Sequence, residues 1–413
     1  MVAAGCRHCR EQGRLANLTV EIDLDSVRHD AMRGDGAVLD DGAASSFRDP
    51  SAPGLWRWGT LLPVAAEHRV SLGEGDTPLV KLERFGKRIG VPELYVKDES
   101  RNPTWSYKDR LCAVAVAKAA EAGAGVITVA STGNHGASTA AYAARAGLPC
   151  VVFTTASVPA VMKTLMQSYG AFVVALDRPT DRWALMSEVV NQRGWFPTSG
   201  FQFPPIGSNA YGIEGYKTIS FETWRQLGRV PDWVAVPTCY GDGLMGVWKG
   251  WRELRDLGLT RTAPRMIAAE VYGSLEAAQQ RELADPVEVE IGPSPAFSIN
   301  TPVGTHQSLV ALRQSQGLAV STKNDDLLAL QRELARTEGI YAEASSLVTL
   351  AAVRRLRAEG KLGGDDVAVA VLTSTGLKDP EATAATLPSV PLIEPELRQL
   401  ARVLRETYQQ ELL

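Results

Sequence analysis

The sequence predicts an α/β protein in which two parallel-sheet units share one cleft. Short apolar runs with the length of strands alternate with helical stretches from about residue 93 to residue 176, and the same alternation returns between residues 233 and 372. This pattern is typical of a parallel sheet whose strands are connected by helices. The sequence holds no internal repeat and no low-complexity tract. Two α/β units fit the pattern better than one very large sheet.

Composition narrows the class of protein. The chain has 413 residues, enough for two or three domains. A hydrophobic content of 45% and a charged content of 22% are typical of globular proteins, and a net charge of -4 argues against a broad nucleic-acid surface. No apolar run approaches the roughly 20 residues that span a bilayer, and residues 1–13 lack the apolar core of a signal peptide. We expect a cytoplasmic protein that binds a small molecule, with no nucleic acid and no membrane among its partners.

Residues 1–60 are expected to form an irregular N-terminal arm, because residues 34–59 are rich in Gly, Asp, Ala and Ser. Cys6 and Cys9 make a single Cys-x-x-Cys pair, whereas a zinc ribbon needs two pairs, so we expect no bound metal. The arm ends in a tryptophan-rich segment, residues 55–58, which either docks onto another surface or packs on its own chain. We favour packing on its own chain. The remaining cysteines lie in apolar runs and are expected in the core: Cys112, Cys150 and Cys239.

The individual elements follow from runs and periodicity. The expected strands are 93–97, 125–130, 148–153, 171–176, 233–237, 265–271 and 367–372. The expected helices are one that follows Lys108 and runs to about Glu121, then 138–146, 159–169, 244–257, 325–337 and 345–357, with a last helix inside the tail 391–413.

The segment Asn102–Arg110 holds the most informative lysine. Ser106 and Asp109 have the spacing of a capping box, which predicts Ser106 as the N-cap and places Lys108 in the first helical turn. The positive end of the helix dipole and partial burial should lower the pKa of Lys108 and make it a better amine nucleophile. The alternative is a surface lysine balanced by Asp109.

Two loops between a predicted strand and a predicted helix are candidate anion sites. The first is Ser131-Thr132-Gly133-Asn134-His135-Gly136, which is either such a site or a plain turn capped by a serine. The second, residues 241–246, matches Gly-x-Gly-x-x-Gly. It would bind either a dinucleotide, with Glu270 on the ribose, or the phosphate of another cofactor. We favour the phosphate of another cofactor.

Asn-Pro-Thr-x-Ser-aromatic-Lys-Asp-Arg resembles the lysine motif of threonine synthases, within the pyridoxal 5'-phosphate (PLP) enzymes of the tryptophan synthase β type (fold type II). Trp105 and Tyr107 depart from the commoner Gly and Phe. Three further segments agree with this family in the same order: 72–79, 340–346 and 372–380. The resemblance covers about residues 55–385. It implies two α/β domains that enclose a PLP cleft.

The resemblance assigns roles to residues of this chain. Lys108 would be the Schiff-base lysine and the catalytic acid and base. Glu343 would be a cleft carboxylate, with a helix-start acid as the alternative, and Thr373 would meet the pyridine nitrogen, with a turn that caps a strand as the alternative. The cofactor would be bound by Lys108, Asn134, Gly241, Asp242, Gly243, Leu244, Met245 and Thr373, with the side chain of Asp242 pointing away from the phosphate. The substrate would be bound by Ser131, Thr132, Asn134, His135 and Glu343.

The resemblance also predicts the domains: an N-terminal arm at 1–60, a large PLP-binding domain of 61–110 plus 209–390, a small mobile domain at 111–208 and a C-terminal tail at 391–413. The expected assembly is a homodimer.

Two departures bear on the reaction. His135 matches the amino-acid dehydratases of the same fold, where threonine synthases have Thr, although it could also be a structural hydrogen-bonding residue. Gly212 stands where threonine synthases have the Arg that pairs with the substrate phosphate. We therefore predict elimination or replacement on a β- or γ-substituted amino acid without a phosphate. The alternatives are an authentic threonine synthase, a threonine or serine dehydratase, and a non-catalytic PLP-binding interaction protein.

Overall fold

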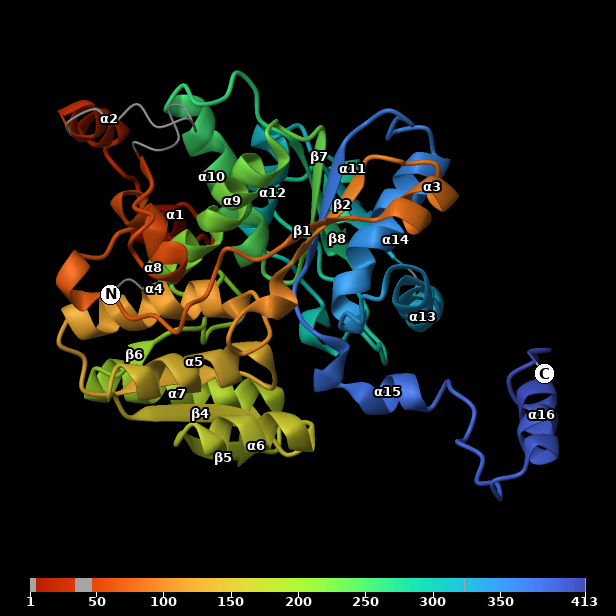
Figure 1. Cartoon of the computed structure of the whole chain (residues 1–413). Coiled ribbons are helices and arrows are strands. Elements are labelled where there is room, and N and C mark those ends of the chain that lie inside the picture. Colours follow the sequence, from red (N-terminus) through yellow and green to blue (C-terminus); the bar gives the residue numbers. More distant parts are fainter. Residues whose placement is uncertain (1–4, 34–46, 323, 413) are drawn as a thin grey trace. The chain divides into compact units, whose positions relative to one another are not determined.

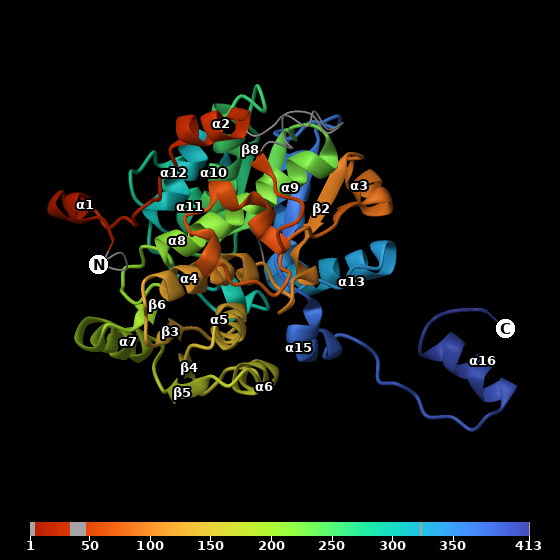
Figure 2. The same ribbon diagram turned by 60° about the vertical axis from the view of Figure 1, so that its left-hand side comes forward.

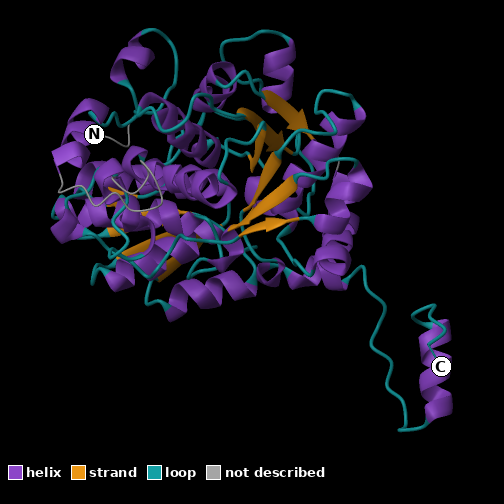
Figure 3. Ribbon diagram, turned by 45° about the horizontal axis from the view of Figure 1, so that its top comes forward, coloured by secondary structure: helices purple, strands orange, loops and turns teal. Residues whose placement is uncertain are grey.

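The computed structural model describes residues 5–33, 47–322 and 324–412. The chain divides into two compact units, Met1–Lys378 and Asp379–Leu413. The first unit contains two sheets, each enclosed by helices (Figures 1 and 3). The protein is thus a mixed α/β structure with parallel sheets, as the sequence predicts. The finer predicted division into domains stays a prediction.

The larger sheet has six strands in the order β1-β2-β10-β7-β8-β9, with β1 antiparallel to β2 and the other neighbours parallel. Alternate residues of β7 enter two different cores. Val234 and Val236 pack on the side of α10, whereas Trp233 and Ala235 pack on the side of α14. Helices therefore cover both faces, which is why the strand reads as a continuous apolar run. The strands are β1 Leu79–Lys81, β2 Leu94–Asp98, β7 Trp233–Pro237, β8 Arg265–Glu270, β9 Leu318–Ser321 and β10 Ala368–Leu372.

Two groups of helices cover this sheet, one on each face (Figure 1). On one side lie α9 Lys217–Leu227, α10 Asp242–Asp256 and α12 His306–Gln314. On the other side lie α3 Glu83–Ile89, α13 Leu327–Glu338 and α14 Ala344–Ala358. Helix α11, Ser274–Gln280, contacts β8 and β9.

The smaller sheet has four parallel strands in the order β5-β4-β3-β6. Val152 of β4 packs in the core that contains α5, and its neighbour Phe153 packs against Met186 of α7 on the opposite face. The elements are β3 Ile127–Ala130, β4 Cys150–Thr155, β5 Phe172–Leu176, β6 Phe196–Pro197, α5 Asn134–Arg145, α6 Ala160–Ser168 and α7 Pro179–Arg193.

Helix α4, Lys108–Glu121, joins the two sheet regions. It packs against α5 on one side and against the short helix α8, Ala210–Ile213, on the other (Figures 1 and 2). The loop that precedes α4 pairs with the loop that follows β10. Ser106 forms a β-bridge with Ser374, and the backbone N–H of Tyr107 donates to the carbonyl of Thr373 at 2.9 Å. The start of α4 is thus fixed at the carboxyl end of the large sheet.

The N-terminal arm is more ordered than the sequence predicts. It contains α1 Arg7–Glu11, α2 Leu24–Arg33 and a 3₁₀ helix, Gly54–Leu61. Residues 34–46 lie outside the described part of the chain. Trp56 and Trp58 are buried at 1% and 2% exposure, and the Trp56 indole N–H donates to the Val70 carbonyl. The favoured alternative, packing of this segment on its own chain, is therefore confirmed.

The second unit contains α15 Pro380–Ala384 and α16 Leu397–Glu406, and the latter is the helix predicted in the tail. Within the described ranges, no helix combines the length and the apolar character that crossing a membrane requires.

Most predicted elements are present with ends shifted by one to four residues. Helix α5 begins at Asn134 instead of 138, and α10 begins at Asp242 instead of 244, so both candidate loops run directly into their helices. The sequence analysis missed several shorter or less regular elements: the strands β1, β6 and β9 and the helices α3, α7, α8, α9, α11, α12 and α15. Cys112 and Cys150 are buried as predicted, whereas Cys239 is half-buried and lines a pocket.

Candidate active site

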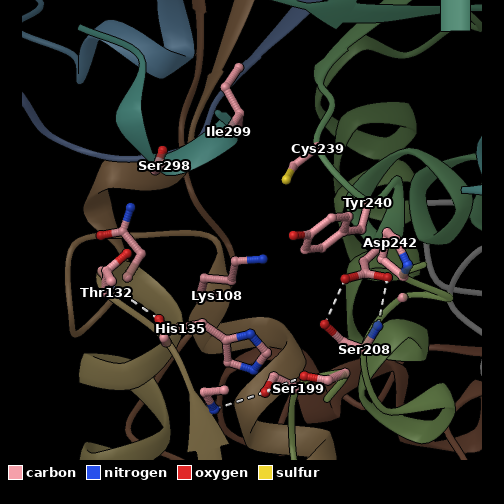
Figure 4. A pocket seen from close by; sticks show the side chains of 18 of the residues that line it. Lys108, Thr132, His135, Ser199, Ser208, Cys239, Tyr240, Asp242, Ser298 and Ile299 are labelled. Atoms are coloured by element: carbon pink, nitrogen blue, oxygen red, sulfur yellow. Dashed lines mark hydrogen bonds between the residues drawn. The ribbon is translucent and has the colours of Figure 1, made fainter. Parts of the chain in front are cut away.

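One cavity of about 200 Å³ lies where strands of both sheets end. Its walls include Ala130 at the end of β3, Pro237 at the end of β7 and Thr373 directly after β10. Side chains gather at this edge because the carboxyl ends of parallel strands lie together there. Figure 4 shows the amine of Lys108 extending into the cavity toward the hydroxyl of Tyr240.

Most of the predicted site residues line this cavity. They are Lys108, Ser131, Thr132, Asn134, His135, Gly241, Asp242, Gly243 and Thr373. Leu244 is fully buried below the cavity wall, and neither it nor Met245 nor Glu343 lines the cavity.

Lys108 is the first residue of α4, as predicted, but Ser106 is not its N-cap. The N-cap is Tyr107, without a side-chain cap, and the Ser106 hydroxyl has no partner among the described residues. The capping-box prediction is wrong because the Asp109 carboxylate is used elsewhere. It accepts from the Thr104 backbone N–H at 2.7 Å and from the hydroxyls of Thr104 and Ser138 at 2.5 and 2.6 Å.

The electrostatics of Lys108 also differ from the expectation. Burial acts to lower its pKa, but Tyr107, Asp242 and Cys239 act the other way, and the pKa of Lys108 is raised overall. The amine lies 4.9 Å from the centre of the Tyr107 ring and 5.8 Å from that of Tyr216. The expected lowering is wrong for the protein alone, because neighbouring acidic groups outweigh burial and the helix end.

A buried ionic network holds the next turn of α4. Arg110 is fully buried, and its guanidinium pairs with Glu99 at 2.6 Å and with Glu222 at 2.7 Å. The Glu222 carboxylate also pairs with Lys97 at 2.8 Å. Burial opposes ionisation of Glu222, but Arg110 and Lys97 hold its pKa well below the usual range. These contacts fix the axial position of α4 and therefore of Lys108.

Asn134 is held from both sides by charged groups. Its Nδ2 donates to the Glu343 carboxylate at 2.8 Å, and its Oδ1 accepts from the Lys378 amine at 2.7 Å. Burial lowers the pKa of Lys378 to about 8, although Asp109 and Glu343 act against that shift. Glu343 thus supports Asn134 from behind the cavity wall.

His135 lines the cavity as a buried imidazole. Its Nε2 has no hydrogen-bond partner among the described residues. Burial and the charge of Lys108 hold the pKa of His135 well below its usual range, so its ring is neutral at pH 7. A neutral imidazole can accept or donate one hydrogen bond at a bound ligand.

The glycine loop before α10 provides a backbone cradle. Gly241 has φ 72°, and a Cβ there would lie 1.9 Å from the Ser308 hydroxyl, so no larger residue fits. Asp242 lines the cavity but its carboxylate turns away to Ser208 and Gln307. It accepts from the Ser208 backbone N–H and hydroxyl at 3.0 and 2.6 Å and from the Gln307 amide at 2.7 Å.

Glu270 does not take the place of a ribose-binding acid. Its carboxylate accepts from the backbone N–H groups of Leu275 and Glu276 at the start of α11, at 3.1 and 2.7 Å. Both oxygens are thus used within the chain, which removes the support for a dinucleotide at this loop.

Several lining residues gave no signal in the sequence. Arg182 and Trp183 come from α7, Gln202 from the following loop and Tyr240 from the segment before Gly241. Lys378 lies behind Asn134, and in the sequence it stands out only as part of the segment 372–380. Gly212 lies outside the cavity, packed against α4.

These residues fit an aldehyde coenzyme that carries a phosphate. An amine reaches into the cavity, a glycine cradle precedes the N-terminus of a 15-residue helix, and the nearest carboxylate, Asp242, is already hydrogen-bonded. On the opposite wall the Thr373 hydroxyl lies 3.0 Å from that of Ser346. The orphaned imidazole nitrogen of His135 also needs a polar partner in the cavity.

Comparison with known proteins agrees with this geometry. Residues 70–374 match the family model described as pyridoxal-phosphate dependent enzyme. The chain is 36% identical to a protein named threonine synthase from Methanosarcina acetivorans, over 80% of this chain and 81% of that one. It is 34% identical to a threonine synthase from Methanocaldococcus jannaschii, over 86% and 87%.

Solved structures show the same fold at lower identity. Maize serine racemase is 19% identical, with a TM-score of 0.63 over 75% of this chain and 91% of that one. Threonine deaminase isoform 2 from Solanum lycopersicum is 18% identical, with a TM-score of 0.62 over 75% and 83%. The fold, the family model and the relatives agree, and the chain therefore belongs to the pyridoxal-phosphate dependent enzyme family.

Proposed function

We propose that the protein is a threonine synthase-like lyase or synthase that carries out elimination or replacement on a β- or γ-substituted amino acid. The single observation that carries the proposal is the amine of Lys108 extending into a cavity built from strand ends of both sheets. Lys108 would hold the coenzyme, the backbone of residues 241–245 its phosphate, and Asn134 and Thr373 its ring. Bound pyridoxal phosphate supplies an electron sink for charge that develops at the substrate Cα.

Lys108 would then move protons at two positions. Its amine takes the proton from Cα and returns a proton to the departing group. The raised pKa of Lys108 in the protein alone means that the amine is protonated until the coenzyme engages it. Ser131, Thr132 and the N-terminus of α5 would orient the α-carboxylate, since helix N-termini bind anions.

Thr373 would set how strongly the coenzyme ring draws electrons. A hydroxyl does not hold a pyridine nitrogen protonated as a carboxylate would, so the ring withdraws electrons less strongly. Such a ring favours elimination and replacement over transamination. The Thr373 hydroxyl is oriented by Ser346, 3.0 Å away.

The substrate is proposed to lack the phosphate of O-phosphohomoserine. Position 212, where the resemblance expects a phosphate-binding arginine, is a glycine packed against Leu111 and Ala115, away from the cavity. The second candidate is an authentic threonine synthase, favoured by relatives of that name at 33–36% identity. His135 leaves a dehydratase as a variant of the first proposal. Family membership and the buried Trp56 and Trp58 argue against a non-catalytic interaction protein.

The test is a substrate panel on the PLP-loaded protein. L-Serine, L-threonine, O-acetyl-L-serine and O-phospho-L-homoserine would be incubated separately, and oxo acid, ammonia, phosphate and new amino acids would be quantified. Threonine and phosphate from O-phosphohomoserine would establish the second candidate and overturn the first. Oxo acid from serine or threonine would support the dehydratase variant. Cytoplasmic location and a homodimer also belong to this proposal, and sedimentation equilibrium tests the dimer.

A further inference from the structure

Two of the five cysteines differ from the rest in their surroundings. Burial raises the pKa of the Cys112, Cys150 and Cys239 thiols to about 12 in each case. Cys6 and Cys9 instead lie partly exposed in the N-terminal arm, and both are free thiols. Reagents in solution can therefore reach these two thiols, whereas the other three stay protonated and unreactive at pH 7.

The two exposed thiols face each other at the start of helix α1. Cys6 is the residue before the helix, with an extended backbone (φ -74°, ψ 115°), and the backbone N–H of Cys9 donates to its Sγ at 3.4 Å. That hydrogen bond and one from the Cys9 thiol lower the pKa of Cys6, whereas the bond to Cys6 raises the pKa of Cys9. Cys6 is therefore the more readily ionised of the two.

The surroundings of the pair favour oxidation over metal binding. A structural zinc site needs four ligands. The part of the chain that the structure describes contains no cluster of three or more side chains that could hold a metal ion. Two cysteines whose side chains already face each other across one helical turn can instead close a disulfide.

The segment that carries the pair is fastened to the loop that lines the cavity. Gly5 directly precedes the pair, and a Cβ there would lie 2.8 Å from the side chain of Ile206, so these two residues are closely packed. Farther along the arm, the Asn17 amide donates to the Ser208 carbonyl at 2.8 Å. Ile206 and Ser208 both line the cavity. A change in the arm near the pair therefore acts on the cavity wall.

We propose that Cys6 and Cys9 are a redox-active pair that a small-molecule disulfide, such as oxidised glutathione, converts into an intramolecular disulfide. The new bond would tighten the segment that packs on Ile206 and so restrain the cavity loop. The site is separate from Lys108 and does not depend on the proposed reaction.

The oxidation takes place by two thiol–disulfide exchanges. The Cys6 thiolate attacks one sulfur of the small disulfide and releases the other half as a thiolate, which leaves Cys6 in a mixed disulfide. The sulfur of Cys9 then displaces the second half from Cys6, and the Cys9 proton passes to a released thiolate. Two protein thiols are oxidised and one small disulfide is reduced to two thiols, so atoms and electrons balance.

The experiment equilibrates the PLP-loaded full chain with reduced and oxidised glutathione in a series of ratios. Each sample is quenched with acid, alkylated and cut by a protease that cleaves after glutamate, which releases residues 1–11 with both cysteines on one peptide. The wild type is compared with Cys6→Ser and Cys9→Ser, because serine also caps a helix and donates a hydrogen bond. Hydrogen exchange at residues 206–208 is followed in the reduced and the oxidised wild type.

The wild-type peptide should lose two hydrogens and resist alkylation once oxidised glutathione predominates. Cys9→Ser should stop at a mixed disulfide on Cys6, formed at least about three-fold faster than Cys6→Ser forms one on Cys9. Exchange at residues 206–208 should be at least about two-fold slower in the oxidised protein.

A pair that stays reduced at every ratio, whether or not zinc is bound to it, would overturn the redox site. Equal rates in the two variants would overturn Cys6 as the attacking thiol. Unchanged exchange at residues 206–208 would overturn the link to the cavity loop.

Discussion

Nζ of Lys378 lies 2.7 Å from Oδ1 of Asn134, and this contact fixes which end of the amide faces which neighbour. On the opposite side Nδ2 donates to the Glu343 carboxylate at 2.8 Å. Turning the amide over would place its N–H₂ against an ammonium and its carbonyl against a carboxylate. Asn134 can therefore present only its remaining N–H as a donor to a ligand.

Lys378→Met should weaken coenzyme binding by roughly 10-fold, about the net worth of one hydrogen bond, because the Asn134 amide is no longer held. Equilibrium titration of the protein with pyridoxal phosphate measures this change. Lys361→Met is the control, since Lys361 is 55% exposed and pairs with Glu359. An unchanged dissociation constant for Lys378→Met would show that Asn134 keeps its orientation without the lysine.

Lys378 should also make stability depend on pH. Burial lowers its pKa to about 8 from an ordinary value of 10.5. Between these values the unfolded chain binds more protons than the folded protein, so the free energy of unfolding rises with pH. This contribution of Lys378 to the free energy of unfolding is fully present above about pH 10.5 and is lost as the pH falls through about 8. Urea unfolding at pH 7, 9 and 10.5 would measure the free energy of unfolding of the wild type and of Lys378→Met. As the pH rises from 7 to 10.5, the difference between the two proteins should shift in favour of the wild type by roughly 1–3 kcal/mol.

Lys108→Ala should abolish covalent attachment of the coenzyme while the fold is kept. Borohydride reduction of the wild type followed by peptide mapping should find the label on the peptide that contains Lys108. Lys87→Ala, at a residue with a 69% exposed side chain, should label as the wild type does. A label on another lysine, above all the buried Lys378, would refute the assignment of Lys108.

Asn17→Ala should loosen the loop that lines the cavity beside Asp242. The Asn17 amide donates to the Ser208 carbonyl at 2.8 Å, which ties the N-terminal arm to this loop. The lost hydrogen bond should lower the free energy of unfolding by about 1 kcal/mol. Hydrogen exchange at residues 206–208 should become faster, whereas Asn191→Ala on the exposed face of α7 should leave it unchanged. Equal exchange in both variants would mean that the arm does not support the loop.

Gly215→Ala should destabilise the protein by about 1–3 kcal/mol or more. A Cβ at this position would lie 1.9 Å from the Arg110 carbonyl, so α4 would have to move. Gly125→Ala is the matched control, because its Cβ would meet no atom within 4 Å. Urea denaturation measures both, and a similar midpoint for the two variants would contradict the close approach.

Elements and loops were predicted correctly where a single contiguous segment of the sequence determines them. Strand β7 spans Trp233–Pro237 as predicted, because a short apolar run buried on both faces ends at a proline. Three motifs were placed correctly, because each lies between the end of a strand and the start of a helix and therefore reaches the same edge of the sheets. They are Lys108, the loop from Ser131 and the loop from Gly241. The predictions failed where the hydrogen-bond partner of a side chain lies far away in the sequence. Ser106 looked like an N-cap, but Asp109 is engaged by Ser138 of another helix.

The sequence by itself determined the α/β class, the family and the loops that line the cavity, because each is encoded in periodicity or in contiguous motifs. Only the tertiary structure decided that Arg182 and Tyr240 reach the cavity, that Lys378 holds Asn134 and that the pKa of Lys108 is raised rather than lowered. The physical reason is that burial and charge act through space. They depend on which side chains packing brings together, and spacing along the chain does not contain that information.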